Sequence, residues 1–205
     1  MKKGWKFLTI ASLLLSSGYL LISPYIKEHN LQTLQPGIAD KIMRFHIMAN
    51  SDEVQDQNLK LQVRDAVGEY LKTYLENAEN KEESIKIIEN HMDGILQTAS
   101  GVITENGYDY EVRGNVVKTY FPRKTYGQYA FPEGEYDALE ITIGKGQGHN
   151  WWCVIYPQMC FASSVYEIDE NAQERLKEVL SAKEYQAVFD SGNYEIRWKF
   201  LEYFK

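Results

Sequence analysis

Most of the side chains that could do chemistry in this chain lie together, in the stretch GKGQGHNWWCVIYPQMC at residues 144–160. The stretch holds three glycines, a histidine, two adjacent tryptophans and both cysteines of the chain. Three kinds of site could use these residues: a catalytic centre, a binding surface closed by a disulfide, or an ordinary buried strand.

His149 and Cys153 are the residue types of a thiol dyad, but their spacing argues against one. We expect a strand over residues 151–156, and residues four apart in a strand lie about 13 Å apart at 3.3 Å per residue. A nucleophile and its base must lie within hydrogen-bond distance. Of the other histidines, only His46 is a plausible partner for Cys153, so we predict no catalytic residue.

The glycines Gly144, Gly146 and Gly148 do not form a phosphate loop. Neither a Walker pattern nor GxGxxG is present, and the stretch leads into a strand instead of a helix. The histidines and cysteines also lack the HxxxH and CxxC spacings of metal sites, so we expect no metal and no other cofactor. A metal site that joins His46, His149 and an acid is the alternative.

Cys153 and Cys160 are separated by a turn-forming residue, Pro157. A disulfide between them is allowed outside the cytoplasm, and closing so short a loop would stabilise the protein by about 2.5 kcal/mol. We expect this disulfide, with two buried free thiols as the alternative.

Trp151 and Trp152 must point to opposite faces of their strand. One can belong to the core, and the other could anchor a partner beside the turn at His149 and Asn150. We therefore expect these four residues to form a recognition surface. The alternative is that both tryptophans are buried.

The N-terminus suggests export. Three lysines among the first six residues precede an uncharged run, Phe7–Ile22. Ser16–Gly18 would suit a signal peptidase, whereas Trp5–Ile26 is long enough for a membrane anchor. We predict that residues 1–26 are one or the other and contact the membrane, with a buried helix of the globular domain as a third alternative.

The rest of the chain would then lie outside the cytoplasm, as a polar linker over residues 27–41 and one domain over residues 42–205. Without the three N-terminal lysines, the formal net charge falls from −7 to −10. So acidic a domain has no electrostatic reason to bind nucleic acid or anionic lipid. Its partner is therefore expected to be another protein or a polymer.

Hydrophobic patterning divides this domain into strands and helices. Residues 42–49 are expected to be a strand with Arg44, His46 and Met48 on one face, followed by N-cap candidates at Asn50–Asp52. Further predicted elements are helices over residues 53–77, 82–104 and 169–189 (with a break near residue 181), strands over 108–112, 116–121, 136–143 and 151–156, a bulge or hairpin turn at 114–115, a loop at 122–134 and a strand in the tail. The sum is an α+β fold, a mainly antiparallel sheet with packed helices after an N-terminal hydrophobic segment.

The first helix should carry a charged stripe opposite its apolar face. Asp56, Lys60 and Arg64 lie four residues apart, with the acid before the bases, which favours helix pairs. The stripe is either solvated surface or a receptor-binding face.

Two long motifs resemble the stage II sporulation protein R family of endospore-forming bacteria. They are RFHIMANSD with DQNLKLQVRDAV at residues 44–67, and FPEGEYDALEITI at residues 131–143. The resemblance covers about residues 40–165 and includes the N-terminal export segment. It implies a signalling protein and not an enzyme. Such a protein is made in the forespore and exported into the space between two membranes. There it triggers a membrane-bound aspartic protease of the mother cell that cleaves the sigma-E precursor.

The candidate partner-binding residues come from this sequence alone, since the resemblance carries no contact residues over. They are Arg44, His46, Asn50, Asp52, Asp56, Lys60, Arg64, His149, Asn150, Trp151 and Trp152. The alternative function is a cell-envelope hydrolase that acts on peptidoglycan, although no pair of carboxylates or other catalytic group stands out.

Overall fold

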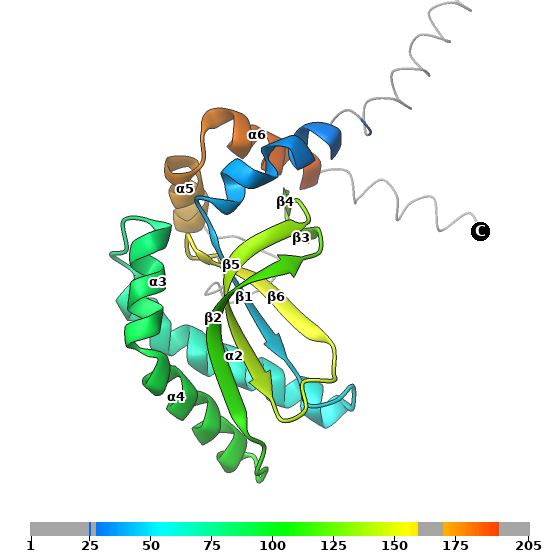
Figure 1. The fold of residues 1–205 in the computed structure, drawn as a ribbon, viewed down its shortest axis with the longest axis vertical. Helices are drawn as coiled ribbons and strands as arrows, with labels where there is room; N and C mark the ends of the chain where they lie inside the picture. Colours follow the sequence, from blue (N-terminus) through cyan, green and yellow to red (C-terminus); the bar gives the residue numbers. More distant parts are fainter. Residues whose placement is uncertain (1–24, 26–27, 160–169, 193–205) are drawn as a thin grey trace, which may run out of the picture.

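The computed structural model describes residues 25, 28–159 and 170–192 of the 205-residue chain. Its centre is a four-stranded sheet in the order β2-β5-β1-β6 (Figure 1). The strands are β1 (Met43–Met48), β2 (Val112–Phe121), β5 (Gly134–Ile143) and β6 (Asn150–Tyr156).

The α+β class is confirmed, but the sheet is mixed. The β2–β5 and β1–β6 pairs are antiparallel, whereas the central pair, β1 and β5, is parallel. Parallel neighbours need a long crossover, and three helices and β2 lie between these two strands in the chain.

Three helices cover one face of the sheet, namely α2 (Val54–Leu75), α3 (Lys81–Asn90) and α4 (Met92–Glu105) (Figure 1). Apolar residues of α2 recur every fourth position and pack against alternate residues of β1, as the pattern predicts. The fully buried members of this core include Leu59, Val63, Val67, Leu71, Met43, Phe45 and Ile47.

Two expectations about this layer are wrong. The helix predicted over residues 82–104 is divided at His91 into α3 and α4. The bulge or turn predicted at Gly114, between strands over residues 108–112 and 116–121, is absent because a single strand, β2, begins at Val112 and continues through this position. A Cβ on Gly114 would lie 3.0 Å from Leu96 of α4, so the glycine provides room for the helix instead of a turn.

A second core lies on the other face of the sheet. Residues 28–39, expected to be a polar tether, are helical, and Leu31 and Ile38 are fully buried in this core. The predicted loop at 122–134 contains a short hairpin, β3 (Lys124–Tyr126) and β4 (Tyr129–Phe131).

Two helices complete this side, α5 (Glu170–Val179) and α6 (Ala182–Gly192), and the break between them at Ser181 is as predicted. Apart from Tyr25, the predicted export segment of residues 1–26 lies outside the described residues, as does the predicted strand in the tail (from residue 193). Within the described ranges, no helix combines the length and apolar character needed to cross a membrane.

Candidate functional site

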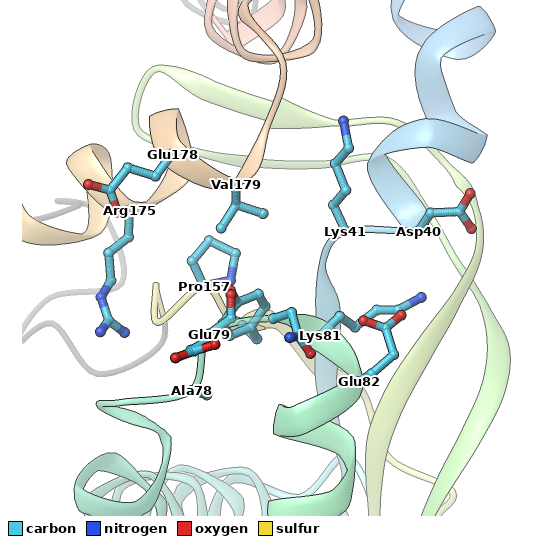
Figure 2. Close-up of a pocket in the computed structure, with 12 residues that line it drawn as sticks. Asp40, Lys41, Ala78, Glu79, Lys81, Glu82, Pro157, Arg175, Glu178 and Val179 are labelled. Atoms are coloured by element: carbon cyan, nitrogen blue, oxygen red, sulfur yellow. The ribbon is translucent and has the colours of Figure 1, made fainter.

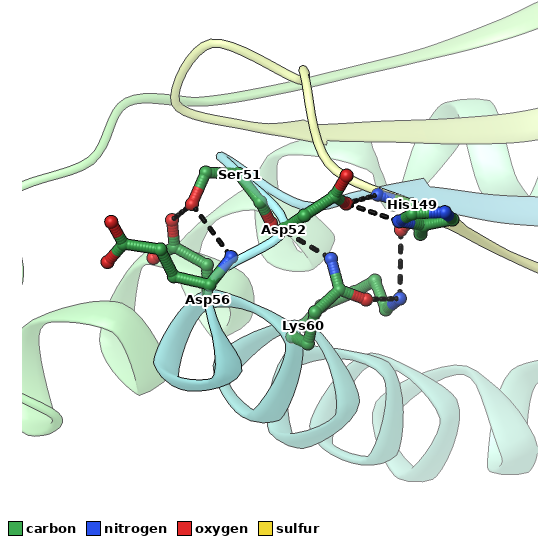
Figure 3. Close-up of polar contacts among 7 residues, drawn as sticks. Ser51, Asp52, Asp56, Lys60 and His149 are labelled. Carbon is green, nitrogen blue, oxygen red and sulfur yellow. Dashed lines mark hydrogen bonds and ion pairs between the residues drawn. The ribbon is translucent and has the colours of Figure 1, made fainter.

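The motif at residues 44–67 and the stretch at residues 144–160 meet at one end of the sheet (Figure 3). Because β1 lies between β5 and β6, the loop that joins β5 to β6 must pass over the C-terminal end of β1. This loop, residues 144–149, lies against the turn between β1 and α2. The backbone N–H of Gly148 donates to Ala49 O at 2.9 Å, and that of Gln147 donates to Asn50 O at 3.3 Å.

The side chains of the turn hold the loop and do not cap α2 as expected. The N-cap of α2 is Glu53, which makes no side-chain capping bond. Asn50 instead donates to Asp56 at 2.8 Å and accepts the backbone N–H of Lys145 at 3.1 Å. Ser51 Oγ also donates to Asp56, at 2.6 Å. The segment between β1 and α2 therefore connects the N-terminal end of α2 to the loop.

The charged stripe on α2 was predicted to be solvated surface or a receptor-binding face, but two of its three residues are buried. Asp56 is 4% exposed beneath Asn50 and Ser51 of the turn, and Lys60 is 5% exposed beneath the loop. Lys60 Nζ donates to His149 O at 2.9 Å and to Gln57 Oε1 at 2.6 Å. Burial lowers the pKa of Lys60, the Arg64 guanidinium lowers it further, and the Asp52 carboxylate opposes them.

His149 is the side chain that this arrangement displays. Its side chain is 81% exposed, and its Nδ1 pairs with the carboxylate of Asp52, which also accepts the backbone N–H of His149 at 2.6 Å (Figure 3). The hydrogen bond from His149 holds the pKa of the Asp52 carboxyl below its usual value. The ring is thus exposed but oriented by its partner.

Two exposed apolar residues lie off the buried stripe of α2, and sequence reasoning missed both. Val54 is 72% exposed and Leu61 is 36% exposed. They are seven positions apart, so they lie on one side of the helix. Their position off the buried apolar stripe was the available signal.

The adjacent tryptophans point to opposite faces, as predicted, and both are half-buried. Trp151 packs edge-on against Phe45 at 5.7 Å, with the Arg64 guanidinium 5.2 Å above its ring. Trp152 stacks on His46 at 4.7 Å. Both tryptophans therefore take part in packing within the domain, and each keeps part of its surface exposed.

Arg44 and His46 are buried, so in this structure they support the sheet instead of contacting a partner. Arg44 is fully buried among aromatic rings, and its Nε donates to Cys153 O at 3.0 Å. His46 is 3% exposed and pairs with Glu140 at 2.9 Å. Burial lowers the pKa of His46, while the Glu140 carboxylate opposes the shift. The second core on this face explains why neither residue reaches the surface.

Neither the thiol dyad nor the shared metal site is formed by the described residues. Cys153 lies opposite Phe45 in the sheet, so it points to the face away from His46. His46 pairs with Glu140 on the sheet, whereas His149 pairs with Asp52 on the loop. No cluster of three metal-binding side chains occurs in the described parts of the chain.

The predicted disulfide stays a prediction, because Cys160 lies outside the described residues. Its partner, Cys153, is 3% exposed near the middle of β6. Mass spectrometry of the exported protein, alkylated without reduction, is expected to show no alkylated cysteine. Two alkylated thiols would contradict the pairing.

A cavity of about 520 Å³ lies at the other end of β6 (Figure 2). Its lining includes the aromatic and apolar residues Tyr156, Pro157 and Val179 and the charged residues Lys81 and Arg175. Its lining comes from four separate stretches of the chain, so no local sequence pattern indicated it.

The comparisons with known proteins agree with the two motifs. Residues 39–166 match the family model described as stage II sporulation protein R, and this range contains both the turn and the loop. A protein of Bacillus subtilis (strain 168) named stage II sporulation protein R is 35% identical over 153 residues, which cover 75% of this chain and 67% of that protein. No solved structure matches. This chain therefore belongs to the stage II sporulation protein R family.

Proposed function

We propose that this protein is an exported signal of endospore formation that triggers a membrane-bound aspartic protease to cleave the sigma-E precursor. Membership of the sporulation family supports the pathway. The observation that carries a signalling role is the loop of residues 144–149, which displays His149 from a base fixed by hydrogen bonds. The uncharged N-terminal run supports export into the space between the two membranes.

The receptor would bind the end of the sheet where this loop meets α2. His149, Asp52 and Val54, the first residue of α2, present a polar ring, a carboxylate and an apolar side chain there. Asn150, at the start of β6, is half-buried beside them. Exposed side chains on a rigid base suit recognition because little conformational entropy is lost on binding.

A cell-envelope hydrolase is the second candidate, and the Asp52–His149 pair is what favours it. A carboxylate that orients an exposed imidazole is the arrangement of a general base. The nearest hydroxyl in the turn, Ser51 Oγ, is instead bonded to Asp56. Without a nucleophile at His149 among the described residues, the signalling role has more support.

Replacing His149 or Asn150 with alanine is expected to abolish cleavage of the sigma-E precursor in sporulating cells, because the receptor would lose its contacts. Immunoblots would measure precursor cleavage and the level of the exported variant. His29→Ala, on the exposed side of the helix over residues 28–39, is the matched control and should signal normally. Exported His149→Ala protein that signals fully would contradict the proposal.

Incubation of the purified protein with cell wall tests the alternative. The signalling role predicts no release of wall fragments by the wild type. Release that His149→Ala or Asp52→Asn removes would establish the hydrolase instead.

A further inference from the structure

We propose that Asn50 and Asp56 are positioning residues, which hold the loop of residues 144–149 and the ring of His149 in the orientation that the receptor recognises. The inference rests on the proposed function only for the identity of the receptor. The hydrogen bonds of the turn between β1 and α2 support the positioning role.

The amide of Asn50 joins α2 to the loop. Its Nδ2 donates to Asp56 Oδ2 at 2.8 Å, and its Oδ1 accepts the backbone N–H of Lys145 at 3.1 Å. Only an amide side chain offers a donor and an acceptor on one short planar group. Alanine would lose both bonds, and aspartate would set two carboxylates against each other.

Asp56 is the fixed end of this connection. It lies in the first turn of α2 and accepts hydrogen bonds from Asn50, Ser51 and Tyr110. Burial by itself would raise the pKa of this carboxyl, but hydrogen bonds, with those from Ser51 and Asn50 the strongest, hold the pKa below its usual value. The group therefore stays an ionised acceptor at neutral pH.

Neither residue is placed to contact the receptor itself. Asp56 is 4% exposed and Asn50 is half-buried. Their effect must pass through the loop, whose backbone N–H groups at Gln147 and Gly148 are bonded to the same turn. Without the hydrogen bond between Asn50 and Lys145, the loop loses one of its attachments four residues before His149.

Exchanging the donor and the acceptor tests the idea without changing net charge. Asn50→Asp alone opposes two carboxylates, and Asp56→Asn alone removes the charged acceptor. In the double variant, the new aspartate at 50 can accept from Lys145 N–H and from the amide of the new asparagine at 56. The bond between residues 50 and 56 is thus restored with reversed polarity and the bond from Lys145 is kept. Ser51 Oγ, which donates to the same oxygen of Asp56 as Asn50 does, can instead accept the second N–H of that amide. Asn58→Asp, on the exposed side of α2, is the matched control.

Two measurements are made on each variant of the full chain. Hydrogen exchange reports whether the backbone N–H groups of Lys145, Gln147 and Gly148 stay protected. Precursor cleavage in sporulating cells, divided by the amount of exported protein, reports signalling. Each single variant is expected to lose protection at these amides and at least about tenfold in signalling, since a hydrogen bond to a charged group is lost. The double variant is expected to recover both.

Several results would overturn the proposal. The single variants could keep the loop amides protected from exchange, or they could lose this protection and still signal normally. The double variant could recover neither protection nor signalling. A double variant that regains stability without signalling would also overturn it, because the pair would then be structural only. Failure of the proposed function looks different, since wild-type protein would then fail to restore precursor cleavage to cells that lack it.

Discussion

Replacing Gly148 with alanine is expected to lower the free energy of unfolding by about 2 kcal/mol or more and to abolish signalling. A Cβ at this position would lie less than 3.0 Å from the carbonyl oxygen and carbon of Ser51. The clash is with backbone, so the loop must move away from the turn. That movement would break the bond from Gly148 N–H to Ala49 O and displace His149.

Urea denaturation followed by circular dichroism would measure this effect. Gly101→Ala is the matched control, since a Cβ at Gly101 in α4 meets nothing within 4 Å. Alanine is the better helix former, so this control should be stabilised by about 0.5–1 kcal/mol. Equal stability of Gly148→Ala and wild type would show that the loop does not rest on the turn.

Much of the fold could be predicted because its periodic segments each bury one face. The four-residue spacing of Leu59, Val63, Val67 and Leu71 predicts α2 with ends within two residues of those observed. Alternation in β1 places Arg44 and His46 on one face and Phe45 on the other, as observed. These patterns are local, and burial of apolar area is what they report.

The failures come from contacts between distant segments. A glycine in an extended run indicates a turn, but Gly114 is a glycine because α4 crosses it. The residues 28–39 were too polar to indicate a buried helix, although Leu31 and Ile38 suffice to anchor it. The parallel β1–β5 pair depends on the path of the whole chain between them, which local spacing does not encode.

The candidate site was found in part for the same reason. The motif at residues 44–67 and the stretch at residues 144–160 were both singled out, yet each was interpreted alone, so Asp56 and Lys60 were predicted to be exposed. In the structure the loop covers Lys60, which donates to His149 O, and the turn before α2 covers Asp56. Some of the residues that were predicted to contact the partner are therefore buried, and they hold the exposed residues in place.

Arg44 shows what burial of a charge costs in this domain. Its guanidinium makes no ion pair with a carboxylate in the described residues, and it lies 4.5–6.0 Å from four aromatic rings, those of Phe121, Phe131, Tyr136 and Tyr126. Desolvation of a buried ion costs several kcal/mol, while each desolvated cation–π contact returns up to about 2 kcal/mol. The two terms are of similar size, so the charge itself adds little net stability and the volume of the side chain should matter more.

Arg44→Ala is therefore expected to lower the free energy of unfolding by about 3–5 kcal/mol. It would empty the space between the rings and remove the donor to Cys153 O and to Tyr126 Oη. Arg44→Met fills most of that space without the charge, and we expect it to cost less than half as much. Lys86→Ala, an exposed cation on α3, is the control for loss of a positive charge.

Urea denaturation of the three variants separates volume from charge. Because a domain of this size is stable by only about 5–15 kcal/mol, Arg44→Ala protein should also accumulate poorly in cells. If Arg44→Met is as unstable as Arg44→Ala, the cation–π contacts outweigh the cost of burying the charge, and the stated balance is wrong. If both variants match the wild type, Arg44 does not lie in the second core, and the four aromatic rings must be packed without it.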